Sequence, residues 1–313
     1  MSLSRASLTR SPGIVLWNSA TFFTRDDLAA RLTAEWKAVE TSMYGQVDKV
    51  RTNLEIKLPL LLWGSWENVS KLFPSSILNP TIGAGLFGTT DLPLVIQGRN
   101  NDRLTFASAQ ITRLADLHLG VDRDLFAAAV EFTCLLKNAT APEADGAFYT
   151  VDTNTYSDTA FAKTNFTRAR FTGTWGAVTG FTNLIPQDGF KVSWNLELKP
   201  VRVDGYGTVD YTLDHFSASV KCLPIGPSLT QLLGGTTGPS NNQLQGYAHG
   251  ILASAVSNDL TLTSSVVTIV AKNAFLADSG AVFSREKLRN GEIEFQTTRG
   301  FSAGVPAAVA TAV

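Results

Sequence analysis

The stretch Tyr-Gly-Gln-Val-Asp at residues 44–48 returns as Tyr-Gly-Thr-Val-Asp at residues 206–210, and each leads into a strand-like segment. Internal repetition of this kind sets the architecture of a whole chain, because each repeat folds as one supersecondary unit. The 313 residues leave room for two domains, each with its own core. The motif therefore indicates two diverged copies of one domain in tandem.

Further features recur in the same order on both sides of this motif. A similarity of residues 53–59 to residues 195–200 does not belong to the series, because the flanking elements do not follow in order. A single large β-sandwich with similar strands remains the alternative. The ordered matches are Val-Leu-Trp-Asn at 15–18 with Val-Ser-Trp-Asn at 192–195, Leu58-Pro59 with Leu223-Pro224, the helix ends Leu72-Phe73 with Leu232-Leu233, a Gly-rich loop after each helix, Asn101-Asp102 with Asn258-Asp259, and Val130-Glu131-Phe132 with Ile293-Glu294-Phe295.

The duplication sets the expected domain boundaries. The first domain covers residues 11–138 and the second covers residues 186–300. Residues 139–185, rich in Thr, Ala, Asp and Asn, are expected to form a linker or long loop with leading strands. Residues 301–313 are expected to form a C-terminal arm.

Alternation of apolar and polar residues predicts that most elements are strands. From Gln46 the period is two, which is typical of a half-buried strand, and Pro59 is expected to end its pairing. The apolar face of that strand holds Val50, Thr52, Leu54, Ile56 and Leu58, and its polar face holds Arg51, Asn53, Glu55 and Lys57. Other strands are expected at 13–17, 92–97, 104–114, 128–136, 169–174, 190–203, 208–223, 250–256, 260–270 and 292–298.

Three segments are predicted to be helical. In residues 24–39, Thr24 can serve as the N-cap, and Leu28, Leu32, Trp36 and Val39 follow helical spacing. This helix would be an insertion in the first copy, since the second copy has a tight turn there. Short helices are expected at 66–73, closed by Pro74, and at 228–233. The fold class is therefore mainly β, with two barrel or sandwich domains that each carry a short flanking helix.

Composition argues against several function classes. Charged residues make up 17% and the net charge is −1, so there is no basic excess to hold nucleic acid tightly. The N-terminus lacks the apolar segment of a signal peptide, and the longest apolar run, residues 58–63, is too short to span a bilayer. We therefore expect folding in the cytoplasm and no membrane partner.

No constellation for catalysis is evident. Asp116 and His118 share a strand face, but two ligands do not make a metal site. The Gly-rich loop at 83–88 has Gly-x-Gly-x-x-Gly spacing but does not connect a strand to a helix, so we interpret it as a flexible loop. Cys134 and Cys222 lie in apolar runs and are expected to be buried. We predict no enzyme activity, no cofactor and no metal.

The order of these elements resembles the tail tube proteins, or major tail proteins, of long-tailed bacteriophages. The stretch Asn-Val-Ser-Lys-Leu-Phe-Pro at 68–74, with the loop after it, is the most family-like part of the first copy, and residues 205–228 are its counterpart in the second. The resemblance implies small β-barrel or sandwich domains, six to a ring, with rings stacked into a hollow tube. It is closest to members with two fused domains, which build homotrimeric rings.

The resemblance also implies partners and a location. The protein would be part of the virion tail, assembled in the host cytoplasm. Its tube would enclose the tape-measure protein, contact other tail proteins and then let double-stranded DNA pass without specific binding. A neutral to acidic lumen lets phosphates slide. Candidate lumen-lining residues, taken from polar strand faces, are Asn53, Glu55, Lys57, Thr208, Asp210, Thr212 and Asp214.

Two other functions fit the same sequence. A tail-terminator, neck or baseplate-hub protein would have the same barrel type but would cap the tube. A β-sandwich adhesin or carbohydrate-binding module would use exposed aromatic residues to stack on sugars. Candidates for that stacking are Trp63, Trp66, Tyr156 and Trp175.

Overall fold

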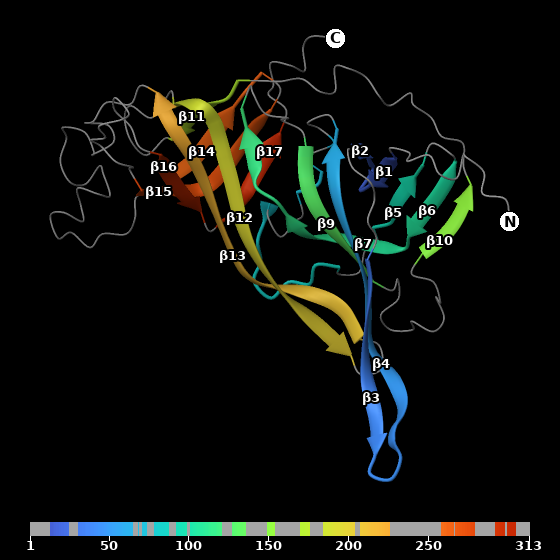
Figure 1. Cartoon of the computed structure of the whole chain (residues 1–313). Coiled ribbons are helices and arrows are strands. Elements are labelled where there is room, and N and C mark those ends of the chain that lie inside the picture. The colour runs from blue at the N-terminus through green and yellow to red at the C-terminus, as the bar shows by residue number, and fades with distance from the viewer. Residues whose placement is uncertain are drawn as a thin grey trace, which may run out of the picture.

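The computed structural model describes residues 13–24, 31–64, 68, 71–73, 78–87, 92–98, 101–120, 127–135, 149–153, 170–175, 184–203, 207–225, 258–265, 267–278, 292–297 and 299–304. This part of the protein is mainly β, as the sequence predicted, and its strands form two antiparallel sheets (Figure 1). The described residues include no helix that is long and apolar enough to cross a membrane.

The first sheet has nine strands in the order β10-β6-β5-β1-β2-β4-β9-β7, with β3 paired to β4. The path of pairings starts at β10 and β6 and ends at β7. Only Ala107 separates β6 from β7 in the chain, so the two ends of the path are adjacent in sequence. The strands are β1 (Ile14–Trp17), β2 (Ala20–Thr24), β3 (Arg31–Thr41), β4 (Gly45–Trp63), β5 (Leu94–Gln97), β6 (Asp102–Phe106), β7 (Ser108–Leu114), β9 (Ala127–Leu135) and β10 (Tyr149–Thr153).

The second sheet has eight strands in the order β11-β14-β15-β16-β13-β12-β8, with β17 paired to β15. β8 comes from the first part of the chain, so it ties the two parts together. β17 lies in the segment predicted to be a C-terminal arm. The strands are β8 (Leu117–Leu119), β11 (Thr172–Trp175), β12 (Ile185–Val203), β13 (Gly207–Ile225), β14 (Asn258–Thr263), β15 (Thr268–Asp278), β16 (Ile293–Thr297) and β17 (Phe301–Gly304).

The two longest hairpins, β3–β4 and β12–β13, have the same register. Their second strands begin at Gly45 and Gly207, both at positive φ, which lie 162 positions apart (207 − 45). Each hairpin has two bulges near its turn, and the same shift superposes them. Because a bulge bends a strand at one defined position, two shared bulges are a specific similarity. The register shifts fall opposite Glu35/Trp36 and Val39/Glu40 of β3, and opposite Glu197/Leu198 and Val201/Arg202 of β12, so the extra residues belong to β4 and β13.

The neighbouring strands repeat as well. In the first sheet, Phe132 of β9 lies opposite Leu58 of β4 on one side and Ile111 of β7 on the other. In the second sheet, Phe295 of β16 lies opposite Val220 of β13 and Leu276 of β15. Leu58 and Val220 are again 162 positions apart (220 − 58), so the match extends beyond the hairpins.

A buried tryptophan marks the same place in both cores. Trp17 packs edge-on against Phe132 at 5.3 Å between ring centroids, and its indole N–H donates to the Ala109 carbonyl at 3.0 Å. Trp175 packs edge-on against Phe295 at 5.3 Å and donates to the Ala274 carbonyl at 2.9 Å. A buried indole needs such an acceptor, and both sheets provide it at equivalent points.

The structure corrects several of the sequence matches. The counterpart of Trp17 is Trp175, whereas Trp194 is half-buried and donates to the Leu114 carbonyl. Leu58-Pro59 is three positions out of register with Leu223-Pro224, given the 162-residue shift. Asn101-Asp102 and Asn258-Asp259 both stand at the start of a strand, β6 and β14, so this match agrees with the structure. The Gly-x-Val-Asp part of the first motif and the Val/Ile-Glu-Phe match do lie at equivalent positions.

The helix predicted at 24–39 is wrong where the structure describes it, because residues 31–41 form β3. Pairing with β4 from Arg31 to Thr41 prevails over a helical spacing that alternating residues also satisfy. A helix would have needed to bury one face, yet Trp36 and Val39 are exposed. Of the helix at 66–73, the structure describes Asn68, residues 71–73 and a turn closed by Lys71 N and Asn68 O. The helix at 228–233 and the strand at 250–256 lie outside the described residues.

Pro59 does not end its strand. β4 continues to Trp63, and Pro59 lies opposite Glu131 of β9. On the other side, Pro59 falls between the last pair with β3, at Lys57, and the first pair with β2, at Leu62. A proline is tolerated at such an interruption because its missing N–H has no ladder bond to make.

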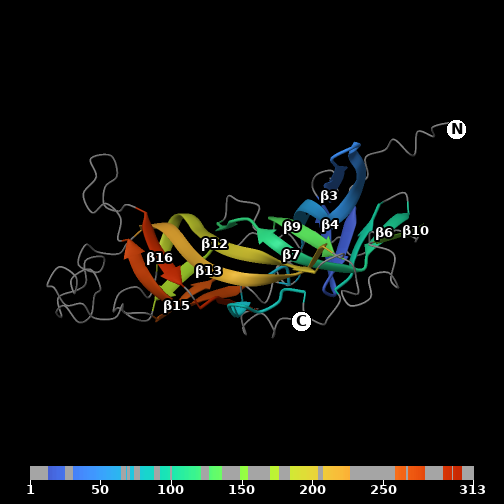
Figure 2. The same cartoon turned by 90° about the horizontal axis from the view of Figure 1, so that it is seen from below.

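The β3–β4 hairpin projects away from the two sheets, whereas the turn end of β12–β13 lies against the base of that projection (Figure 1). Seen from below, β12 and β13 of the second sheet lie beside β7 and β9 of the first (Figure 2). Equivalent hairpins therefore have different surroundings.

Candidate assembly junction

The contact of the β12–β13 turn end with the first sheet, here called the junction, contains most of the polar residues that the sequence singled out. It forms because β13 crosses β4 where β4 leaves the sheet to enter the projecting hairpin (Figure 1). Asn53 and Glu55 of β4 face Thr208 and Tyr211 of β13 there. Inter-sheet contacts of this kind set how the two parts of the chain are oriented.

Residues 83–87 form the backbone part of the junction. The N–H groups of Gly83 and Leu86 donate to the carbonyls of Leu213 and Tyr211, each at 2.7 Å, and Leu213 N donates to the Ala84 carbonyl at 3.1 Å. The segment thereby extends the second sheet at β13, which covers part of an edge. The flexible loop expected at 83–88 is thus wrong for these residues, which are held by hydrogen bonds.

Gly85 lies against the Asp210 carboxylate at this contact. A β-carbon at that position would lie 2.3 Å from a carboxylate oxygen of Asp210, closer than packed atoms can be. The same carboxylate accepts a hydrogen bond from Phe87 N at 2.9 Å. Glycine therefore lets the segment approach β13 closely while Asp210 holds its end.

A buried amide links the two strands. Asn53 is 2% exposed, and its side-chain oxygen accepts a hydrogen bond from Thr208 N at 2.8 Å. Thr208 is 5% exposed, so water has little access to this N–H. A buried backbone donor without an acceptor is costly, so Asn53 satisfies a requirement that the junction itself creates.

A charged hydrogen bond lies beside it. The Tyr211 hydroxyl donates to Glu55, which is 6% exposed, and Lys57 is 3.2 Å from the other carboxylate oxygen. Burial, and then the hydrogen bond to Glu55, raise the pKa of Tyr211 above its usual value. The phenol therefore stays neutral and donates, and the buried carboxylate has partners on two sides.

Side chains at the rim complete the junction. Arg202 of β12 lies 3.4 Å from Glu35 of β3, and both are exposed, so this ion pair contributes little. Farther along β12, the indole N–H of Trp194 donates to the Leu114 carbonyl at 2.7 Å, and its ring packs edge-on against Phe73. Lys191 and Asp116 form an ion pair at 2.8 Å beside β8. Desolvation opposes ionisation of Asp116, but hydrogen bonds from Lys191 and Ser193 outweigh it and lower its pKa.

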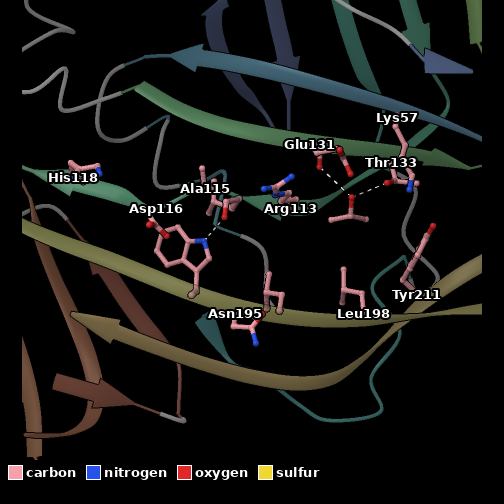
Figure 3. A pocket seen from close by; sticks show the side chains of 14 residues that line it. Lys57, Arg113, Ala115, Asp116, His118, Glu131, Thr133, Asn195, Leu198 and Tyr211 are labelled. Atoms are coloured by element: carbon pink, nitrogen blue, oxygen red, sulfur yellow. Dashed lines mark hydrogen bonds between the residues drawn. The ribbon is translucent and has the colours of Figure 1, made fainter. Parts of the chain in front are cut away.

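A cavity of about 730 Å³ opens between β12 and the first sheet (Figure 3). Its lining includes the charged residues Lys57, Arg113, Asp116 and Glu131, and several of its polar groups already bond to each other. For example, Thr112 and Thr133 share a hydrogen bond at 2.8 Å. Small-molecule sites are mostly apolar with a few placed polar groups, so this cavity is better described as a gap between two sheets.

The seven candidate lumen residues differ in burial. Asn53, Glu55 and Thr208 are buried in the junction, so the expectation that they lie on an exposed polar face is wrong. Asp210 and Thr212 are partly buried, and Thr212 pairs with Gly85. Lys57 is partly exposed, and Asp214 is exposed and lies 2.7 Å from Lys199. A lumen role for Lys57, Asp210, Thr212 and Asp214 stays a prediction.

Other groups in the described residues offer little chemistry. Cys134 and Cys222 are buried free thiols, as expected, and burial raises the pKa of both, that of Cys222 to about 12. Within the described ranges no cluster of three or more His, Cys, Asp or Glu residues could hold a metal ion. Trp175, a candidate for sugar stacking, is buried, and Trp63 is partly buried. Trp66 and Tyr156 lie outside the described residues.

Sequence reasoning missed Gly85, Tyr211 and Trp194 as junction residues. A usable signal was the gapless alignment of residues 35–48 with residues 197–210, which shares Glu, Lys and Val before the Tyr-Gly-x-Val-Asp motif. That alignment matches part of the segment predicted as a helix, 24–39, to part of the predicted strand 190–203, and so would have indicated a strand in both copies. The sequence matches no protein-family model, and no curated protein matches it.

Proposed function

We propose that this chain is a structural protein that assembles with copies of itself into rings, which stack into the tail tube of a long-tailed bacteriophage. The observation that carries the proposal is the repeated strand pairing, in which both sheets share registers, bulges and a buried tryptophan. A chain with two equivalent sheets joined by one defined contact is a natural unit for a ring of such contacts.

The strand paths support a barrel for each part. In the first sheet the path of pairings starts at β10 and β6 and returns to β7, which follows β6 in the chain. In the second sheet, Gly173 of β11 bridges Leu184, which directly precedes β12. Closure into a barrel removes strand edges that would otherwise pair with other chains at random. Two tandem barrels would then give three chains the outline of a six-part ring.

The proposed tube would enclose the tape-measure protein and later conduct double-stranded DNA. A net charge of −1 suits a conduit, since phosphates are not held by a basic surface. Four of the candidate lumen residues, Lys57, Asp210, Thr212 and Asp214, are at least partly exposed in one chain, and Asp210 and Thr212 also contact residues 85–87. A tail-terminator, neck or hub protein would have the same barrels, and a tube is favoured only by the resemblance.

Negative-stain electron microscopy of the purified chain, with mass photometry, tests the proposal. The expected result is rings or tubes of uniform bore built from multiples of three chains. Single rings that never stack would favour a capping role. A stable monomer that binds glycans would overturn the proposal in favour of a carbohydrate-binding module.

A further inference from the structure

The two equivalent hairpin ends differ in what covers them. We call residues 36–49 the first tip and residues 198–211 the second tip, which the 162-residue shift superposes. Every residue of the first tip is exposed, whereas in the second tip Gly207 and Thr208 are buried and Tyr211 is half-buried. The difference arises because the second tip lies in the junction and the first projects into solvent (Figure 1).

The first tip exposes large apolar side chains. Met43 is 83% exposed and Tyr44 is 77% exposed, and they sit next to each other at the turn. Trp36, Val39 and Val47 are exposed along the same hairpin. Single exposed apolar residues are ordinary, but five on one projecting hairpin indicate a surface that becomes covered. At the position of Trp36, the second tip carries Leu198, which packs against the core.

The second sheet has the surface that such a tip would occupy. The acceptor of the second tip consists of Asn53 and Glu55 on β4, and the shift places His215 and Ser217 of β13 at those positions. Asn53 is buried, but His215 is exposed, and nothing in the described part of the chain covers it. One chain therefore has a tip without an acceptor and an acceptor without a tip.

We propose that the first tip of one chain docks on β13 of a second copy, around His215 and Ser217, and so repeats the junction between chains. The proposal rests on the self-assembly proposed above and names its contact. A head-to-tail contact of this kind leaves the same two surfaces open on every added chain, so it gives a ring if the rotation closes and a filament if it does not.

Two contacts of the junction do not carry over. The Tyr211–Glu55 hydrogen bond has Lys49 and Ser217 at the equivalent positions. The Arg202–Glu35 pair becomes Glu40 beside Glu197, which are like charges at an exposed rim. An exposed charge pair counts little beside the burial of several apolar side chains. The exposed apolar side chains that the proposed contact would cover are Met43, Tyr44 and Val47.

Cross-linking between chains tests the contact directly. One chain carries Gln46→Cys and another carries His215→Cys, the counterparts of Thr208 and Asn53, which are hydrogen-bonded in the junction. The native thiols are buried and do not compete. A short bis-maleimide should link the two chains when they are mixed. A Val151→Cys chain, exposed at the edge strand β10, replaces the His215→Cys chain in the matched control.

A heterodimer that forms with His215→Cys and not with Val151→Cys supports the contact. Equal yields from both mixtures, or linkage of Gln46→Cys chains only to each other, would overturn it. A triple variant, Met43→Ser, Tyr44→Ser and Val47→Thr, should abolish assembly, while Tyr149→Ser with Val151→Thr on β10 should leave it intact. Assembly that survives the triple variant would also overturn it.

These results separate the contact from the tube. Rings or tubes that form without the cross-link would refute the contact and leave the proposed function standing. A specific cross-link in a protein that makes only open filaments or small oligomers would support the contact and refute the tube. A wild-type chain that stays monomeric at every accessible concentration would refute both.

Discussion

Replacing Asn53 by Ala should weaken the junction by a predictable amount. The variant removes the acceptor that lies 2.8 Å from Thr208 N, and both residues are nearly inaccessible to water. A buried donor left without an acceptor costs about 1–3 kcal/mol. We expect Asn53→Ala to lower the free energy of unfolding by about 2 kcal/mol and to speed exchange of the Thr208 amide proton by roughly 30-fold, since 1.4 kcal/mol is a factor of ten.

The repeat provides a matched control. His215 occupies the position of Asn53 in the second hairpin, 162 residues on (215 − 53), and its side chain is exposed. His215→Ala should change the free energy of unfolding by less than about 0.5 kcal/mol. Both variants are best measured by urea denaturation and by hydrogen exchange in the Met43→Ser, Tyr44→Ser, Val47→Thr background, so that assembly does not add to stability.

The comparison can refute the reasoning. If the two substitutions cost the same within about 0.5 kcal/mol, then the Asn53 hydrogen bond does not stabilise the junction. If Asn53→Ala is costly but Thr208 exchange is unchanged, the loss comes from elsewhere in the first sheet.

Three further predictions concern the same contacts. Tyr211→Phe should lower the free energy of unfolding by about 1–3 kcal/mol at neutral pH. Since the pKa of Tyr211 is raised, its contribution is fully present below the usual phenol pKa and is lost as pH rises from there through the folded value. The stabilities of wild type and variant should therefore begin to converge above about pH 10 in denaturation experiments. Gly85→Ala should destabilise by about 1–3 kcal/mol and cost less in a chain that already carries Asp210→Ala, which removes the clashing carboxylate; additive costs in this double-mutant cycle would contradict that cause. Trp17→Phe and Trp175→Phe should lower the free energy of unfolding by amounts within about 1 kcal/mol of each other, because each removes the indole donor to one buried carbonyl. Thermal or urea unfolding measures both, and a much larger difference would contradict the equivalence of the two cores.

Most strands could be predicted because alternation is a local signal. The exceptions show where local reasoning stops. In residues 31–41, Leu32, Ala34 and Trp36 satisfy a period of two, while Leu32, Trp36 and Val39 satisfy a helical period, so the pattern alone cannot choose. Pairing with β4 makes these residues a strand, and that pairing cannot be inferred from the local pattern.

The junction was harder to predict than the strands. Asn53 and Glu55 alternate with apolar residues, which is typical of a solvent-facing side, but the second hairpin covers them. Their burial follows from a contact with residues about 155 positions away, as for Thr208 and Asn53 (208 − 53). No periodicity in β4 carries that information. These residues are polar because they form hydrogen bonds inside the junction, and not because they face solvent.

The divergence of the two hairpins argues that their surroundings, not their fold, were under different constraints. Register, bulges and the turn glycine are the same, so the backbone of one hairpin could replace the other. The side chains differ where the contacts differ, since Asn53 satisfies a buried donor and His215, at the same position, faces solvent in one chain. A tip that had no partner would gain solubility by replacing Met43 and Tyr44 with polar residues. Their presence on a projecting hairpin is explained if a second chain covers them, which is the contact that the cross-link between positions 46 and 215 detects.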